Sequence, residues 1–100
     1  MGISMTASAD GTRVSIAVSG KFDFQLYDDF RSAYAETTGK GVAYTVDLSE
    51  TEYLDSSALG MLLLLREHAG GERSDIEITG APAEVRKILD VANFGKLFRL

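Results

Sequence analysis

Three consecutive polar residues, Asp55, Ser56 and Ser57, stand where a strand-like pattern passes into a nearly all-apolar, helix-like segment. A serine hydroxyl at a helix start lies beside unpaired backbone N–H groups and the positive end of the helix dipole, and both favour an added negative charge. A phosphoryl group is such a charge, since it adds about −1.5 to −2 units at neutral pH. The pattern therefore predicts reversible phosphorylation, with Ser56 as the acceptor and Ser57 as its neighbour.

Each of these residues also has a structural interpretation. Ser56 or Ser57 alone would serve as a helix N-cap, and Asp55 either caps the same helix or orients the serine and helps to hold a kinase or its metal. Tyr53 either belongs to the core or presents an aromatic edge to a partner. Asp23 either caps an earlier helix or reaches the same partner surface. All five residues are candidates for partner binding.

A hydrolase with Ser56 as nucleophile does not fit the spacing of the residues. The glycine pattern of a nucleophile elbow is absent, and the one histidine, His68, lies twelve residues further along the same helix, which is about 18 Å along its axis. Acidic pairs such as Asp28–Asp29, or Glu50 with Glu52, are typical of solvated surface. We therefore expect no enzymatic activity, no metal site and no cofactor.

Composition narrows the class of protein and the class of partner. A chain of 100 residues that is 45% hydrophobic and 25% charged predicts one folded domain spanning residues 1–100. The net charge of −5 argues against nucleic acid as a partner. The apolar run Ala58–Leu65 is far shorter than the roughly 20 residues that span a bilayer, and Met1–Ser8 lacks the charged start of a secretory signal. Because cysteine is also absent, we expect a cytoplasmic protein that binds no membrane.

The first third of the chain predicts a hairpin and a helix. Ile3–Ser8 and Thr12–Ser19 flank a turn-forming Ala-Asp-Gly, and the second run alternates apolar and polar residues, as in a strand that Gly20 closes. Apolar residues then recur at helical spacing between Phe22 and Tyr34, which predicts an amphipathic helix. Its first turn is capped by Asp23, and the stop and turn come from Thr37, Thr38, Gly39 and Gly41.

The middle of the chain predicts the strand and the helix that meet at Ser56. The mostly apolar run Val42–Leu48 indicates a central strand covered on both faces. In the following helix, the consecutive leucines Leu62–Leu65 cover every face and predict burial, and Gly60 predicts close helix packing.

The last third predicts a further strand and helix. After Gly70-Gly71, the residues Ile76–Thr79 indicate a strand. Pro82 suits the first turn of a final helix, whose Val85, Ile88, Leu89 and Ala92 share one face, and Phe94–Leu100 packs as a short cap. The order β-β-α-β-α-β-α implies an α/β fold with a mixed β-sheet, an N-terminal hairpin and packed helices. In such sheets partners tend to meet the loops beyond the carboxyl ends of the strands, where Asp47–Ser57 would lie.

The chain resembles the sulfate transporter and anti-sigma factor antagonist (STAS) domain family over nearly its whole length. The strongest similarity is the string D-L-S-E-T-E-Y-L-D-S-S-A-L-G from Asp47 to Gly60, which looks like the family's switch loop. The segment Gly20–Asp23 is similar to the entry of the family's first helix, and Ala92 to Phe98 is similar to its closing hydrophobic turn. Many relatives have glycine where this chain has Ala58. Alanine favours helix but limits how closely a partner backbone can approach, so this difference bears on which partner binds.

The resemblance implies a function. In bacterial anti-sigma factor antagonists the serine directly after the aspartate is phosphorylated by a partner kinase, and this position falls on Ser56. The unphosphorylated protein is then expected to bind an anti-sigma factor or a similar regulator, and phosphorylation to release it until a serine phosphatase, such as a response-regulator phosphatase, restores the hydroxyl. The alternative is a binding subunit of a transporter or lipid-transport complex that does not cycle through phosphorylation.

Overall fold

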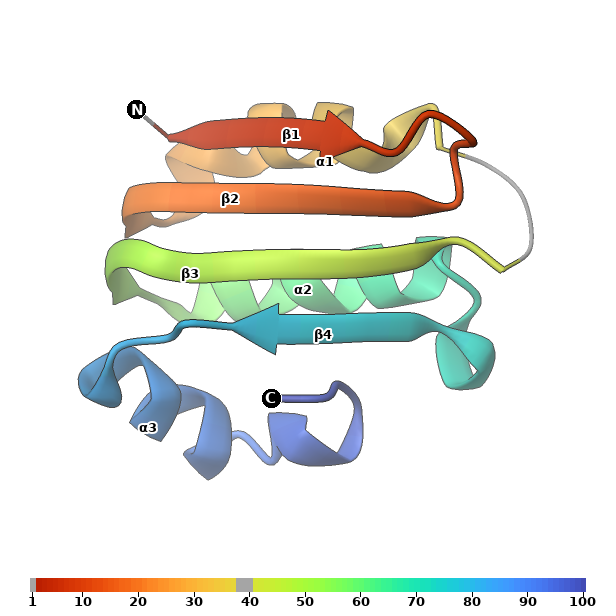
Figure 1. The fold of residues 1–100 in the computed structure, drawn as a ribbon. Helices are drawn as coiled ribbons and strands as arrows, with labels where there is room; N and C mark the ends of the chain where they lie inside the picture. The colour runs from red at the N-terminus through yellow and green to blue at the C-terminus, as the bar shows by residue number, and fades with distance from the viewer. Residues whose placement is uncertain (1, 38–40) are drawn as a thin grey trace.

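The computed structural model describes residues 2–37 and 41–100, which form one four-stranded sheet with helices packed against it. The strands are β1 (Ile3–Ala7), β2 (Arg13–Phe22), β3 (Ala43–Leu54) and β4 (Asp75–Thr79), adjacent in that order. The helices are α1 (Tyr27–Ala35), α2 (Ser56–His68) and α3 (Ala83–Val91), with short 3-10 helices η1 (Phe24–Leu26), η2 (Gly71–Arg73) and η3 (Phe94–Lys96). β1 pairs antiparallel to β2, whereas β2, β3 and β4 are mutually parallel (Figure 1). The predicted order β-β-α-β-α-β-α and the mixed sheet are confirmed.

The β1–β2 hairpin is closed by the carboxylate of Asp10. This carboxylate accepts hydrogen bonds from the Ser8 hydroxyl (2.7 Å), the Thr12 hydroxyl (2.8 Å) and the Thr12 backbone N–H (3.1 Å). These donors favour the charged form, and they lower the pKa of Asp10 from 3.8 to about 2, with the Ser8 hydroxyl as the largest cause. The short polar residues between the strands thus supply their own turn.

β2 is longer than its sequence predicts. Gly20 has φ of +78° but does not close the strand, because the pairing with β3 continues past it with a shift of register between Gly20 and Lys21. Glycine tolerates this left-handed conformation, so a bulge keeps the strand in the sheet. Phe22, predicted as the first apolar residue of a helix, is instead the last residue of β2, fully buried and opposite Leu54 of β3.

The sheet is covered by helices on one face only. α1 and α2 lie behind the sheet in Figure 1, and no helix of the described residues crosses its front. β3 is central, as predicted, but it is not covered on both faces. Its Thr45 lies in a row between Ser15 of β2 and Glu77 of β4, and all three side chains are half-buried or exposed. Because the side chains in this row are short or charged, the open face of the sheet tolerates water.

The core lies between the sheet and the helices, and the C-terminal segment closes it beside β4. Val85 and Leu89 of α3 are buried, while Ile88 and Ala92, predicted on the same face, are exposed. Pro82 is the N-cap of α3, one residue before the predicted first turn. The buried apolar residues are Val14, Ile16, Val18, Phe22, Phe30, Ala33, Tyr34, Val42, Tyr44, Val46, Leu48, Leu54, Ala58, Met61, Leu62, Leu65, Ile76, Ile78, Val85, Leu89, Phe94 and Phe98.

Two further predictions concern the C-terminal segment and the end of α1. Phe94 and Phe98 pack into the core as the closing turn predicts, and Arg99 in addition pairs with β4 through backbone hydrogen bonds to Ile76 and Ile78. α1 ends at Ala35, and the predicted turn residues Thr38 and Gly39 lie outside the described residues.

Candidate functional site

The candidate site lies where β2 and β3 end side by side. Phe22 and Leu54 are opposite each other, and the next residue, Asp55, donates its backbone N–H to the Phe22 carbonyl at 3.4 Å. β3 passes there directly into α2, at the left edge of the sheet in Figure 1. The loop after β2 and the start of α2 are therefore held together by the parallel pairing of their strands.

Asp55 is the N-cap of α2. Its backbone is extended, and its Oδ1 accepts the Ala58 N–H at 3.0 Å and the Ser57 hydroxyl at 2.6 Å. The Ser57 hydroxyl is the largest cause of a lowered pKa for Asp55; burial opposes it, and the Ala58 N–H again favours the charged form. Of the interpretations open from the sequence, helix capping by Asp55 is the one that the hydrogen bonds describe, and neither serine is the cap.

The two serines differ in their surroundings although they are neighbours. Ser57 is half-buried, and its hydroxyl proton is committed to Asp55. Ser56 is the first residue of α2 and is exposed, and no hydrogen bond involves its hydroxyl within residues 2–37 and 41–100. The Ser56 Oγ is thus the accessible nucleophilic oxygen at this helix start.

Asp23 and Tyr53 belong to the paired ends of β2 and β3 that precede the serine helix. Asp23 is half-buried and caps η1, because its Oδ1 accepts the Gln25 N–H at 3.0 Å. Tyr53 is 50% exposed, while its neighbour Leu54 is 2% exposed. Of this adjacent apolar pair, the structure therefore places Leu54 in the core and Tyr53 at the surface beside the site.

Phe24 is a surface residue of this site that sequence reasoning missed. It was expected on the apolar face of an amphipathic helix, but it follows the buried end of β2 and lies in η1 with 67% of its surface exposed. Its ring stacks on Tyr27 with centroids 5.4 Å apart and an interplanar angle of 23°. The sequence carries no clear signal for this exposure, because the strand period would place Phe24 on the same face as the buried Phe22 and the helical spacing also places it among apolar residues.

The outward face of α2 carries apolar side chains, contrary to the sequence prediction. Leu62 and Leu65 are fully buried, but Leu63 and Leu64 are 39% and 46% exposed. A helix on one face of a sheet buries only the stripe that faces the strands, so four consecutive leucines cannot all reach the core. Gly60, predicted to allow close packing, is exposed, and a Cβ added there would meet no atom within 4 Å.

The histidine and the acidic residues are the other side chains that bear on catalysis or metal binding. His68, at the far end of α2 from Ser56, hydrogen bonds through Nε2 to the Thr37 carbonyl at 2.7 Å and packs on Tyr34. Within residues 2–37 and 41–100, no three His, Asp or Glu side chains are grouped as a metal site would need. In the same residues no helix combines the length and the hydropathy needed to cross a bilayer.

A family model described as "Mlab, STAS domain" matches residues 5–99 of this chain. The chain belongs to the STAS domain family. A STAS-domain containing protein of Pseudomonas aeruginosa strain UCBPP-PA14 is 50% identical over 100 residues, which cover all of this chain and 99% of that protein. The resemblance in the strand-to-helix segment around Ser56 thus extends over the whole domain.

Solved structures share the fold of this STAS domain at low sequence identity. The unphosphorylated form of the anti-sigma factor antagonist SpoIIAA superposes with a TM-score of 0.78 at 15% identity, covering 97% of this chain and 85% of that one. An anti-sigma factor antagonist from Mycobacterium paratuberculosis gives a TM-score of 0.72 at 22% identity, covering 97% and 83%. At these identities the likeness establishes the arrangement of strands and helices.

Proposed function

We propose that this STAS domain is a cytoplasmic anti-sigma factor antagonist that is switched by phosphorylation of Ser56. In this proposal the unphosphorylated form binds an anti-sigma factor or a similar regulator through Asp23, Tyr53, Asp55, Ser56 and Ser57. A serine kinase blocks binding by modifying Ser56, and a serine phosphatase, such as one of the response-regulator class, restores it. The domain itself contributes a binding surface and no catalytic group.

The observation that carries the proposal is the exposed, unengaged hydroxyl of Ser56 at the first position of α2. The side chains on either side are committed to structure, because Asp55 caps the helix and Ser57 donates to Asp55. A kinase therefore finds one free hydroxyl in a fixed position. The same fixed position makes that hydroxyl a sensitive point of contact for a regulator.

The size of the switch follows from electrostatics. A phosphoryl group on Ser56 adds about −1.5 to −2 charges at the residue that directly follows Asp55. If docking presses the phosphate against an apolar part of the regulator, the dianion loses its water without gaining a partner, which costs several kcal/mol, and each ~1.4 kcal/mol is a tenfold loss of affinity.

The fold should survive the modification. The helix dipole favours the phosphate by about 0.5 kcal/mol, while the adjacent Asp55 carboxylate opposes it and already holds the Ala58 N–H. Because Ser56 is exposed, no core side chain moves to make room. We therefore infer that phosphorylation changes binding and leaves the free energy of unfolding within about 1 kcal/mol of its starting value.

The test compares four forms of the protein in cells of the source organism: the starting chain and the variants Ser56→Ala, Ser56→Asp and Ser57→Ala. Intact mass should show one added phosphoryl group on the starting chain and on Ser57→Ala, and none on Ser56→Ala. Affinity pull-downs should retain the regulator with Ser56→Ala and lose it with Ser56→Asp. Equal retention by these two variants would refute the switch. An unmodified chain that copurifies with membrane transport proteins would instead support the binding-subunit alternative.

A further inference from the structure

We infer that Phe24 and Tyr53 are the apolar anchors of the regulator-binding surface, and that they receive a partner whose docking face is apolar at its centre and carries Lys or Arg at its rim. The inference rests on the proposed function, since it assigns the chemistry of the regulator to the surface around Ser56. Neither residue is needed to build the core, because 67% of Phe24 and 50% of Tyr53 are exposed. Large exposed aromatic side chains that flank a binding site are typical of interface hot spots.

Phe24 is held ready for binding by its surroundings. Asp23 fixes the start of η1 through the Gln25 N–H, and Tyr27 stacks against one face of the Phe24 ring. The other face of the ring remains open to solvent, as its exposure indicates. A ring that is already ordered loses little conformational entropy on binding, so more of its apolar burial contributes to affinity.

Phe24 and Tyr53 belong to the two strand ends that hold the start of the Ser56 helix. Tyr53 is two residues before Asp55 on β3 and faces Lys21 of β2 across the strand pair, while Phe24 is two residues after Phe22, whose carbonyl accepts the Asp55 N–H. Both anchors are therefore fixed to the same two hydrogen-bonded strand ends as the hydroxyl. A partner docked across these two strand ends would also cover Ser56, where a phosphate would lose its water and oppose docking.

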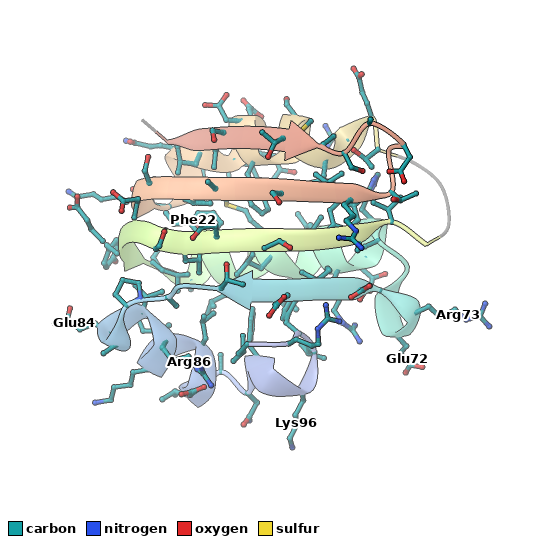
Figure 2. All side chains as sticks on the ribbon, viewed as in Figure 1. Phe22, Glu72, Arg73, Glu84, Arg86 and Lys96 are labelled. Atoms are coloured by element: carbon teal, nitrogen blue, oxygen red, sulfur yellow. The ribbon has the colours of Figure 1, made fainter. Side chains whose placement is uncertain are left out.

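The charge around the rings selects the partner's chemistry. The segments 20–25, 49–57 and 81–85 meet at the carboxyl ends of the parallel strands and contain the carboxylates Asp23, Glu50, Glu52, Asp55 and Glu84, with Lys21 as the one cation. Glu50, Glu52 and Glu84 border an open groove of about 630 Å³ between β3 and the start of α3, and Glu84 stands at that end of the molecule in Figure 2. A neutral or acidic partner would leave these carboxylates facing like charge or none, whereas basic residues at the rim complement them.

The exposed apolar residue Val91 provides a matched control. It is 76% exposed near the end of α3, outside the segments that surround Ser56. Phe24→Ala and Val91→Ala both remove an exposed apolar side chain, so neither should disturb the core. In the Ser56→Ala background, Phe24→Ala should lower affinity for the regulator at least about 10-fold and Val91→Ala less than about twofold. Equal affinity of the two variants would overturn the inference.

Photo-crosslinking tests the partner's chemistry directly. p-Benzoylphenylalanine placed at position 24, 53 or 91 of the Ser56→Ala chain is irradiated in cells of the source organism, and the crosslinked peptides are sequenced. The inference requires that positions 24 and 53 capture the protein retained in the Ser56→Ala pull-down, within a segment that carries Lys or Arg beside apolar residues, and that position 91 does not. Crosslinking to a second copy of this chain, or to an acidic segment, would overturn it.

The outcomes separate this inference from the proposed function. If Ser56→Ala and Ser56→Asp retain the same protein equally, while positions 24 and 53 still crosslink to its basic segment, the anchors stand and the switch fails. If the serine variants differ, but Phe24→Ala binds as tightly as Val91→Ala, the switch stands and the anchors fail. Whenever the anchors stand, with or without the switch, raising the salt concentration should weaken binding, because the contacts at the rim are ionic.

Discussion

Replacing Asp55 tests whether its carboxylate builds the switch helix. In Asp55→Ala, α2 loses the acceptor for the Ala58 N–H, and the Ser57 hydroxyl loses its partner at 2.6 Å. Loss of an N-cap costs about 0.5–2 kcal/mol, so the free energy of unfolding should fall by roughly 1 kcal/mol. For a domain of this size the midpoint of thermal unfolding should then fall by about 4–8 °C.

Asp55→Asn separates the hydrogen bond from the charge. Asparagine caps helices about as well as aspartate, so this variant should keep most of the stability that Asp55→Ala loses. Circular dichroism melts of the two variants, with Ser57→Ala as a third sample, measure the difference. A melting midpoint of Asp55→Ala equal to that of the starting chain would refute the assignment of Asp55 as a stabilising cap and would return it to a role in kinase or metal binding.

The capping carboxylate also makes a prediction about pH. The pKa of Asp55 is lowered in the folded chain, so the folded state favours the charged form. The stability that this carboxylate contributes is therefore present above its unfolded pKa and is lost as the pH falls through its folded pKa. In Asp55→Asn this part of the acid destabilisation should disappear, which a comparison of melting midpoints at neutral and acidic pH measures.

Three further predictions follow from other parts of the fold. Gly60→Ala should raise the free energy of unfolding by up to about 1 kcal/mol in denaturant titrations, because the new Cβ meets no atom within 4 Å and alanine favours helix; a lower midpoint would contradict the open site. Leu62→Ala should lower the free energy of unfolding by about 2–5 kcal/mol in the same assay, whereas Leu64→Ala should change it by no more than about 0.5 kcal/mol. Equal losses in the two variants would contradict the exposure of Leu64. NMR titration should find the pKa of Asp10 at about 2 and a higher pKa in Ser8→Ala. Because the pKa of Asp10 is lowered in the folded chain, the stability that this carboxylate contributes to the hairpin is lost as the pH falls from about 4 towards 2. An unchanged pKa in Ser8→Ala would contradict the turn geometry.

The sequence predicted the fold well where local periodicity and burial agree. The hairpin alternation, the central strand before Ser56 and the apolar stripe of the last helix all specify elements that the structure contains. It failed where tertiary context overrides the local pattern. Gly20 ends a strand by its propensity, but pairing with β3 carries β2 through a bulge to Phe22. The apolar spacing that begins at Phe22 looks helical, yet its first member is held in the sheet opposite Leu54.

The run of four leucines failed for a related reason. Hydropathy records that Leu63 and Leu64 are apolar, but only the position of the sheet decides which side of α2 is covered. Likewise the both-faced burial predicted for β3 requires helices on two sides, and α1 and α2 lie on the same side (Figure 1). Right-handed crossovers fix the side of each helix only after the order of the strands is known, and the sequence alone left that order undetermined.

The two serines of the site also show what the sequence could predict and what only the structure decides. By sequence, Ser56 and Ser57 are identical residues at one helix start, and either alone would serve as its cap. In the structure Asp55 occupies the cap position, so the helix needs no serine for that purpose, and the Ser57 hydroxyl turns inward to complete the carboxylate's hydrogen bonds. Ser56, one residue earlier, cannot make that contact and points to solvent. A free hydroxyl beside two engaged neighbours follows from the geometry of the cap, and it is this geometry that allows one residue to change binding without changing the fold.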